Sequence, residues 1–256
     1  MRAGCTMPGM SGQPAVRRPE HLLMASPGRD VAVTVVTVVL TAVLFAAVAS
    51  SGVLAHIQRL DEAWLQLMVS HRSAPVTALA KFLNVLGLIY ITLPVRIAIA
   101  GYLALRRRWW HLAAFVAAVV LSEILIGTLK GIYDRARPPE SLVATSGASF
   151  PSGHAIAASV TVVAAVIALV PPGRRRAAWG AAAVAFSILM ALSRAYLGAH
   201  WLSDAVAGVL LGTSCALVTA LMVGLLQRRW VAHRPGGPAP PAERPAPGTT
   251  EPADQR

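Results

Sequence analysis

The sequence predicts an all-α membrane protein, a polytopic bundle of six transmembrane helices. Hydrophobic residues make up 55% of its 256 residues and charged residues only 13%, about half the charged share of an ordinary soluble domain. Apolar runs of about 18 residues or more recur along the chain, and a helix needs that length to cross a bilayer. Short arginine clusters separate these runs, as in membrane proteins whose loops carry topology signals.

The apolar runs give the positions of the expected helices. We expect spans at residues 31–54, 84–105, 109–129, 153–171, 177–193 and 201–226. Residues 56–82 are semi-polar and predict a short interfacial helix, a turn at Pro75 and then entry into the second span. Most linkers are short, so neighbouring helices are expected to pack antiparallel. Residues 30–230 therefore form one six-helix membrane domain.

Both ends of the chain differ in composition from this domain. Residues 1–29 are rich in Pro, Gly and Met, and residues 231–256 are rich in Pro. Such compositions are typical of disordered segments. No apolar core precedes a cleavage site in the first segment, so we interpret it as a cytoplasmic tail and not as a signal peptide.

The formal net charge of +12 indicates topology and not a nucleic-acid partner. Arginine clusters lie before the first span, between the second and third, between the fourth and fifth, and after the sixth. With six spans, all four clusters fall on one side, which the positive-inside rule makes cytoplasmic. We therefore expect a multi-pass protein of the cell membrane with both termini in the cytoplasm.

Polar residues gather in the loops on the opposite, extracytoplasmic side. These loops contain KGIYDRARPPESLVATSGASFPSGH, residues 130–154, and SRAYLGAHWLSD, residues 193–204. Lys130, Arg135 and Arg137 break the charge bias, so a topology signal does not explain them. They favour a site for a phosphate, with a basic loop that grips anionic lipid as the alternative. Charged groups near hydrocarbon are costly, which also favours a functional role.

The second of these loops holds residues that suit nucleophilic chemistry. His200 and Asp204 are four residues apart, so on the first turn of a helix they would share a face. A carboxylate there can hold the proton of one imidazole nitrogen and leave the other nitrogen nucleophilic. Arg194 can offer a bidentate fork to phosphate oxygens. A purely structural His–Asp hydrogen bond is the alternative interpretation.

The first loop ends in FPSGH, residues 150–154, which predicts the start of a helix. Pro151 and Ser152 suit a helix N-terminus, and Gly153 lets the backbone approach a ligand closely. The free amides of a first turn attract anions. His154 would then lie beside a bound anion, where a protonated imidazole can donate a proton to a leaving oxygen.

The order and spacing of these pieces resemble the three-part signature of the type 2 phosphatidic acid phosphatase family. The three pieces are Lys130, six residues, Arg137 and Pro138; then Pro151-Ser152-Gly153-His154; then Ser193-Arg194, five residues, His200, three residues and Asp204. The resemblance extends over roughly residues 60–226. It implies the six-helix core that this family shares with the vanadium haloperoxidases.

The resemblance also implies a role for each residue. His200 would attack phosphorus in line and form a phosphohistidine, with Asp204 orienting the ring, and His154 would protonate the leaving group and then activate water. The non-bridging oxygens would be held by Lys130, Arg137, Ser152, the amide of Gly153 and Arg194. No metal or other cofactor is expected, because a cationic cradle can neutralise the transferred phosphoryl group.

The resulting hypothesis is a membrane lipid-phosphate phosphatase. A polyprenyl diphosphate such as undecaprenyl diphosphate fits an outward-facing site, and phosphatidate or phosphatidylglycerophosphate fits it nearly as well. The alternatives are a phosphotransferase that uses the same histidine and a non-catalytic lipid-phosphate binder. A zinc hydrolase built on His154, His200 and Asp204, and a serine protease built on Ser152, leave the nearby cations unexplained. Haloperoxidase activity is disfavoured, because the haloperoxidases resemble soluble proteins.

Two further features lie outside the motifs. Arg96 and Glu123 fall inside expected spans, and we expect them to pair, because an unpaired charge there is expensive. Trp109, Trp110 and Trp201 are expected to anchor the helices at the membrane interface.

Overall fold

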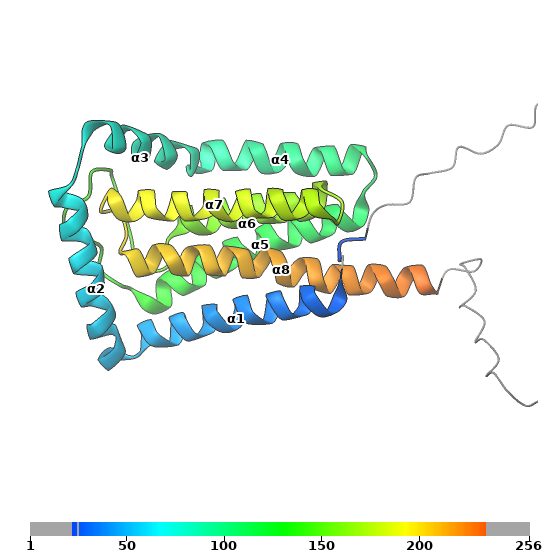
Figure 1. The fold of residues 1–256 in the computed structure, drawn as a ribbon, viewed down its shortest axis with the longest axis horizontal. Helices are drawn as coiled ribbons and strands as arrows, with labels where there is room; N and C mark the ends of the chain where they lie inside the picture. The colour runs from blue at the N-terminus through cyan, green and yellow to red at the C-terminus, as the bar shows by residue number, and fades with distance from the viewer. Residues whose placement is uncertain (1–21, 25, 234–256) are drawn as a thin grey trace, which may run out of the picture.

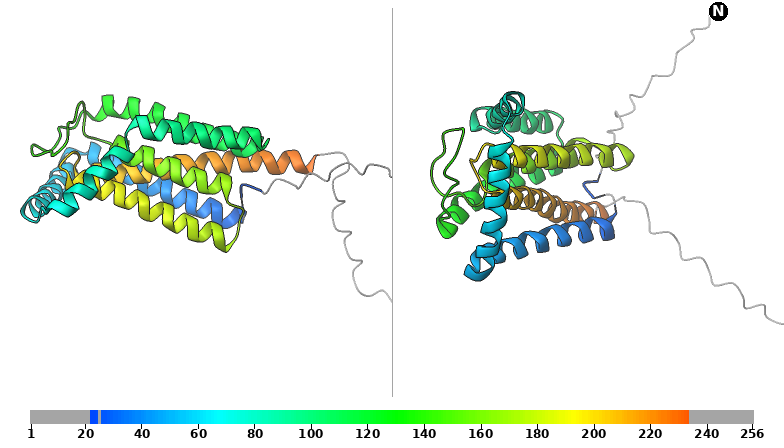
Figure 2. Two further views of the ribbon diagram at one scale, coloured as in Figure 1. Left: turned by 90° about the horizontal axis from the view of Figure 1, so that it is seen from above. Right: turned by 60° about the vertical axis from the view of Figure 1, so that its left-hand side comes forward.

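Helices are the regular elements of the computed structural model, which describes residues 22–24 and 26–233. In that part of the chain they are α1 (Pro27–Ala49), α2 (Ser51–Ser70), α3 (Ala74–Leu86), α4 (Ile89–Leu105), α5 (Trp109–Tyr133), α6 (Gly153–Leu169), α7 (Arg174–Tyr196) and α8 (Leu202–Ala232). The bundle is elongated, and α2 lies across one of its ends (Figures 1 and 2). The all-α fold class is thus confirmed for the described residues.

The helices cover the expected spans, but two breaks fall inside them: α1 ends at Ala49 within the expected span 31–54, and the break between α3 and α4 lies within the expected span 84–105. Within the described residues, α1, α5, α7 and α8 are long and apolar enough to cross a membrane, and α3 with α4 adds a fifth crossing if this pair, bent by 53°, is one span. These helices make the chain a multi-pass membrane protein. α6 has 17 residues, nine of them buried among its neighbours. Six crossings are therefore not confirmed and stay a prediction.

The boundaries of both expected tails need correction. Leu23 and Met24 are only 2% and 3% exposed, and the Leu23 amide donates a hydrogen bond to Oε1 of Gln227 over 3.1 Å. α1 already begins at Pro27, since proline suits the first turn of a helix. At the other end, α8 continues past residue 230 to Ala232. The remainder of the tails, residues 1–21 and 234–256, lies outside the described residues.

The semi-polar stretch 56–82 contains a helix, a break and the start of a second helix, but the break falls at residues 71–73 and not at Pro75, where the turn was predicted. α2 covers most of it, and α3 begins with Pro75 in its first turn. The break between α3 and α4 falls at Gly87 and Leu88, and it redirects the chain along the bundle. The predicted interfacial helix is longer than expected, because α2 continues directly from the end of α1.

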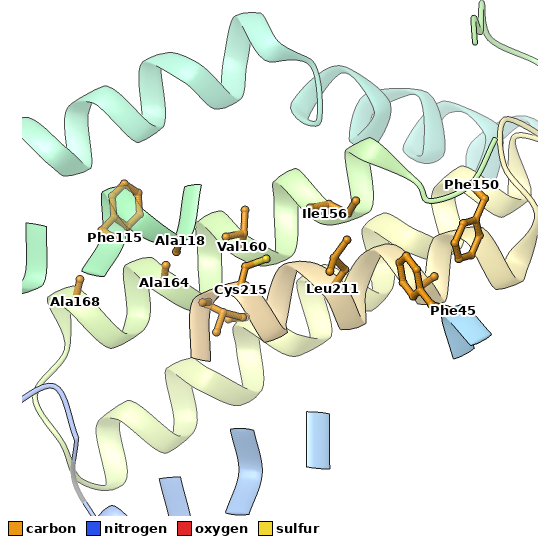
Figure 3. Packing of buried hydrophobic residues seen from close by; sticks show 14 of the residues in the cluster. Phe45, Phe115, Ala118, Phe150, Ile156, Val160, Ala164, Ala168, Leu211 and Cys215 are labelled. Atoms are coloured by element: carbon orange, nitrogen blue, oxygen red, sulfur yellow. The ribbon is translucent and has the colours of Figure 1, made fainter. Parts of the chain in front are cut away.

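The core lies where α6 and α8 pack on α1 and α5. Figure 3 shows Val160 and Ile156 of α6 near Cys215 and Leu211 of α8. Close approach of these two helices requires glycine: a Cβ at Gly208 would lie 2.7 Å from the Ser152 carbonyl oxygen. Small residues at a helix interface in a membrane let the backbones approach and gain dispersion contacts. The beginning of α6 is thereby held against the beginning of α8.

Substitution of Gly208 tests this packing. We expect Gly208→Ala to destabilise the protein by about 1–3 kcal/mol, because overpacking forces the backbone to shift. Gly127→Ala is the matched control, since a Cβ there meets nothing within 4 Å. Thermal unfolding in detergent measures both variants. Equal midpoints for Gly208→Ala and Gly127→Ala would contradict the close contact.

The expected intramembrane ion pair is present. Nη1 of Arg96 lies 2.7 Å from Oε1 of Glu123. Arg96 is buried, and its Nε donates to the hydroxyl of Thr161 over 2.9 Å. Because a buried guanidinium needs partners for its donors, these contacts link α4, α5 and α6. Glu123 precedes Lys130 by seven residues in α5, which places the pair about 10 Å below the polar loops at roughly 1.5 Å per residue.

Candidate active site

The three motifs come together at the end of the bundle that α2 crosses. Lys130 lies in the last turn of α5, Arg194 in the last turn of α7, and Asp204 in the first turn of α8. The loops that join these helices, residues 134–152 and 197–201, lie at this same end (Figure 1). The arginine clusters 106–108, 174–176 and 228–229 lie at the other ends of the helices. The segregation of polar motifs from basic clusters agrees with the prediction.

The start of α6 leaves a serine hydroxyl available. Ser152 is the N-cap residue, but its side chain makes no capping hydrogen bond, and its buried Oγ has no hydrogen-bond partner. The segment is fixed by Phe150, whose ring centre lies 4.8 Å from that of Phe45 (Figure 3). The ring centre of Tyr133, in the same aromatic cluster, is 4.7 Å from that of Phe150. A helix N-terminus with an unused hydroxyl suits an anion.

His200 is fixed in one tautomer. Its Nδ1 lies 2.7 Å from the carbonyl oxygen of Ser149, and a carbonyl oxygen only accepts, so Nδ1 carries the proton. Nε2 then presents a lone pair, which lies 3.3 Å from Nη1 of Arg137. The imidazole is therefore arranged as a nucleophile that faces a cation.

The electrostatic surroundings keep this imidazole neutral. Burial lowers the pKa of His200 well below its usual value of 6.5, and the cations Arg194, Arg137 and Lys130 lower it further. The bond to Ser149 opposes these effects only in part. A depressed pKa means that His200 stays unprotonated and nucleophilic at neutral pH and through the range just below 6.5.

The predicted contact between His200 and Asp204 differs from expectation. His200 precedes α8, whose N-cap is Trp201, so the pair does not share a helical face. The nearest oxygen of Asp204, Oδ2, is 3.9 Å from Nδ1 of His200, beyond hydrogen-bonding distance. Asp204 accepts hydrogen bonds instead from the Trp201 amide and the Ser149 hydroxyl. A carboxylate at N3 of a helix commonly bonds back to the N-cap amide, and this capping geometry turns it away from the ring.

Two predicted phosphate ligands contact the loop before α6. The Lys130 ammonium donates to the Ala148 carbonyl over 2.6 Å. Arg137 donates from Nε to the carbonyl of Gly147 and from Nη1 to that of Ala199. Both cations lie near His200 and can exchange these neutral acceptors for phosphate oxygens, since a charged acceptor makes the stronger bond. Burial lowers the pKa of Arg137, and Asp204 opposes that shift.

Arg194 and His154 meet at Asn84 on α3. One Nη of Arg194 donates to Oδ1 of Asn84, and the Asn84 backbone also hydrogen-bonds to His154. Nε of Arg194 and Nε2 of His154 are buried without a hydrogen-bond partner. Gly87 lies directly against the His154 ring, where a Cβ would clash with the ring carbons.

Three buried polar atoms of the motifs are thus unsatisfied: Ser152 Oγ, His154 Nε2 and Arg194 Nε. Native structures pair nearly all such atoms, and the exceptions are commonly functional. Arg194, Arg137 and Lys130 interact electrostatically with both His154 and His200. Unsatisfied polar atoms beside shared cations suit a bound anion at this end of the bundle.

The surroundings of Arg135 and Trp201 differ from those expected from the sequence. Arg135 is buried and donates to side chains of α2 and α8, so its terminal nitrogens are not free for the phosphate that was expected here. Trp201 is 8% exposed, donates from its indole nitrogen to the Ala136 carbonyl and lies against the Arg135 guanidinium. It is part of the site's support and not an interfacial anchor. Trp109 is 60% exposed, as an anchor would be.

Several contributing residues were missed from the sequence. Asn84 and Gly87 contact Arg194 and His154 from α3, and Asp61 on α2 bonds to Arg135. Asn84 could have been found as a polar residue in a largely apolar helix, whereas Asp61 lies among other polar residues of the semi-polar α2 and does not stand out. Ser149 contacts His200 through its backbone carbonyl, which carries no sequence signal at all.

The described histidines and acidic residues of the site do not gather into a set of metal ligands. Among residues 22–24 and 26–233, no group of three or more His, Cys, Asp or Glu side chains is placed to hold a metal ion. The zinc alternative built on His154, His200 and Asp204 therefore has no ligand set in this geometry.

Comparison with known proteins identifies the class to which this architecture corresponds. Residues 109–228 match the model of the PAP2 superfamily, and all three motifs lie within that segment. This match confirms the resemblance to type 2 phosphatidic acid phosphatases. The lipid A 1-phosphatases of Rhizobium etli and Rhizobium johnstonii are each 36% identical over 126 residues, or 44% of this chain. The chain spans about half the length of these curated relatives, 50% and 48%.

Solved structures show the same fold. The PAP2-type phosphatidylglycerolphosphate phosphatase of Bacillus subtilis is similar with a TM-score of 0.64 and 25% identity, over 77% of this chain and 96% of that one. LpxE of Aquifex aeolicus is similar with a TM-score of 0.52 and 21% identity, over 62% of this chain and 94% of that one. The described chain therefore has the fold of a membrane PAP2 protein.

Proposed function

We propose that this protein is a lipid-phosphate phosphatase that works through a phosphohistidine and without a metal ion. One observation carries the proposal: a neutral, oriented His200 faces a cluster of cations beside buried polar atoms of Ser152, His154 and Arg194 that lack partners. Each of these groups has a use in phosphoryl transfer, which depends on positioning and charge neutralisation. The likeness to lipid phosphatases supports the same conclusion.

In the first step, Nε2 of His200 attacks phosphorus, so that a P–N bond forms as the bond to the lipid oxygen breaks. His154 donates a proton to the departing oxygen. In the second step, His154 takes a proton from water, the water oxygen attacks phosphorus, and the P–N bond breaks to release phosphate and regenerate His200. Lys130, Arg137 and Arg194 neutralise the non-bridging oxygens throughout, with the Ser152 hydroxyl and the Gly153 amide as further donors.

The site faces the extracytoplasmic side in this proposal. The basic clusters occupy the opposite end of the bundle, and the positive-inside rule assigns that end to the cytoplasm. The substrate is a lipid whose phosphate reaches the site while its apolar part stays among the helices. Undecaprenyl diphosphate, phosphatidate and phosphatidylglycerophosphate fit, and the Rhizobium relatives add lipid A carrying a 1-phosphate.

The test is phosphate release by the detergent-purified protein in EDTA. We expect release from at least one of these four lipids, inhibition by vanadate, which mimics five-coordinate phosphorus, and no release by His200→Ala. Loss of activity in EDTA would contradict the metal-free mechanism. Phosphate transfer to an added alcohol in place of water would support the phosphotransferase alternative, and tight binding without turnover would support the binder.

A further inference from the structure

A continuous series of hydrogen bonds joins α2 to the ring of His200. It begins at Asp61, which is 3% exposed and lies outside the segment that matches the family model. Asp61 bonds to Arg135, Arg135 to Asp204, Asp204 to Ser149, and Ser149 to His200. The orientation of the nucleophile therefore depends on a helix that carries none of the three motifs.

Both terminal nitrogens of the Arg135 guanidinium are engaged with protein groups. Nη1 donates to Oδ1 of Asp204 over 2.6 Å and to the hydroxyl of Ser203 over 2.7 Å. Nη2 donates to Oδ2 of Asp61 over 2.8 Å and to Oε1 of Gln58 over 2.6 Å. Its side chain is 7% exposed. An arginine fork held by two buried carboxylates fixes both of them in space.

Asp61 is itself held on two sides. Its Oδ1 accepts from the Ser203 amide over 2.8 Å, and its Oδ2 accepts from the Ser203 hydroxyl over 2.6 Å. These bonds attach α2 to the first turn of α8, next to Asp204. The contact places a second carboxylate close to Asp204, with the Arg135 cation between them.

Ser149 transmits this arrangement to the ring. Its amide donates to the Arg135 carbonyl over 2.7 Å, and its hydroxyl donates to Oδ2 of Asp204. Its own carbonyl accepts the Nδ1 proton of His200 over 2.7 Å. Both the backbone and the side chain of Arg135 thus determine where Ser149, and hence the lone pair of His200 Nε2, is directed.

We propose that Asp61 and Arg135 are positioning residues for the nucleophilic His200, acting through Asp204 and Ser149. This inference rests on the proposed phosphatase function. It makes α2 part of the active site, although α2 contributes no group that touches the phosphate.

The charge balance makes the proposal testable. Without Arg135, the carboxylates of Asp61 and Asp204 face each other, and like charges at close range force one of them to take up a proton. Lys130 and Arg137 also interact electrostatically with Asp204, but their donors serve the loop carbonyls and the phosphate site. Replacing Asp61 as well leaves a single carboxylate and removes the repulsion.

The experiment compares Arg135→Gln, Asp61→Asn and the double variant in the full-length protein. Arg59→Gln is the matched control, because Arg59 is exposed on the same helix. We measure kcat, KM and the pH profile of phosphate release. We also measure vanadate protection, which is the vanadate concentration needed to raise the midpoint of thermal unfolding. The vanadate measurement reports the geometry of the site without turnover, and the midpoint without vanadate reports folding.

For Arg135→Gln we expect kcat to fall about 10²-fold, as for a small misplacement of a reacting group. The acid limb of its profile should move to higher pH by about one unit or more, and vanadate protection should weaken at least tenfold. The double variant should regain at least about a tenth of wild-type kcat, with the wild-type acid limb, because the repulsion between carboxylates is gone.

Wild-type kcat, pH profile and vanadate protection in Arg135→Gln would overturn the inference while leaving the proposed function intact. A folded double variant no more active than Arg135→Gln would also overturn it. If Arg135→Gln does not fold, the test is Asp61→Asn. A kcat, pH profile and vanadate protection in Asp61→Asn equal to those of the wild type would contradict the inference. A wild-type protein that neither releases phosphate nor responds to vanadate would overturn the proposed function itself, and the inference with it.

Discussion

His200→Ala is expected to lower phosphate release by about 10⁴-fold or more, since loss of a nucleophile removes the covalent route entirely. The reason is the geometry of the ring: Nδ1 is committed to the Ser149 carbonyl, so Nε2 is the nitrogen left to attack. Arg137, 3.3 Å from that nitrogen, cannot replace it, because a guanidinium has no lone pair available.

A second variant shows whether the intermediate is covalent. His154→Ala removes the group that activates water in the second step and also the proton donor of the first step. We therefore expect it to accumulate a phosphohistidine when given a labelled substrate whose leaving group departs without protonation. The label should be acid-labile and absent from the His154→Ala/His200→Ala double variant. Label that persists in the double variant would place the nucleophile elsewhere. Full phosphate release by His200→Ala would refute the mechanism.

Arg194→Lys is expected to lower kcat/KM by about 10²- to 10³-fold, the usual cost of losing a fixed transition-state donor. The guanidinium has separate nitrogens for two tasks: one Nη bonds to Asn84, while the buried Nε has no protein partner. Lysine offers a single nitrogen on a flexible chain, so it cannot hold Asn84 and a phosphate oxygen in the same geometry.

The control for this change is Arg175→Lys, because Arg175 is exposed and lies at the other end of α7. We expect it to leave kcat/KM unchanged. Steady-state kinetics on the same lipid in EDTA compare the two variants. Equal kinetics for Arg194→Lys and the wild type would mean that the unpartnered Nε does not bind the substrate.

The sequence was sufficient to predict the membrane class, the motifs and the positions of most helices, although the breaks inside the expected spans 31–54 and 84–105 were not foreseen. Apolar length is a local property, so the spans at 109–129 and 177–193 fall inside α5 and α7. The pairing of Arg96 with Glu123 also followed from sequence, because an apolar environment leaves two opposite charges few other partners. The number of crossings did not follow, since α6 is shielded by its neighbours and α3 is bent against α4.

The details of the site were harder to predict for specific physical reasons. The spacing of His200 and Asp204 suggested a direct hydrogen bond, but α8 begins after His200, and Asp204 caps that helix instead. Trp201 has the residue type of an interfacial anchor, yet its indole nitrogen bonds to a loop carbonyl beneath the site. In both cases the start of α8 at Leu202 determines the contacts of these side chains, and a local sequence pattern does not show where that helix starts.

The sequence by itself determined that this is a multi-pass helical membrane protein with three polar motifs gathered at one end. Composition, span length and motif spacing can be read along the chain, and apolar runs of sufficient length form helices in the bilayer because no other open structure satisfies the backbone there. Only the tertiary structure decided which groups touch which: that Ser149 orients His200, that Asn84 holds Arg194, and that Asp61 reaches the site from α2. Those contacts join residues between 51 and 110 positions apart, and their geometry depends on how closely the helices pack.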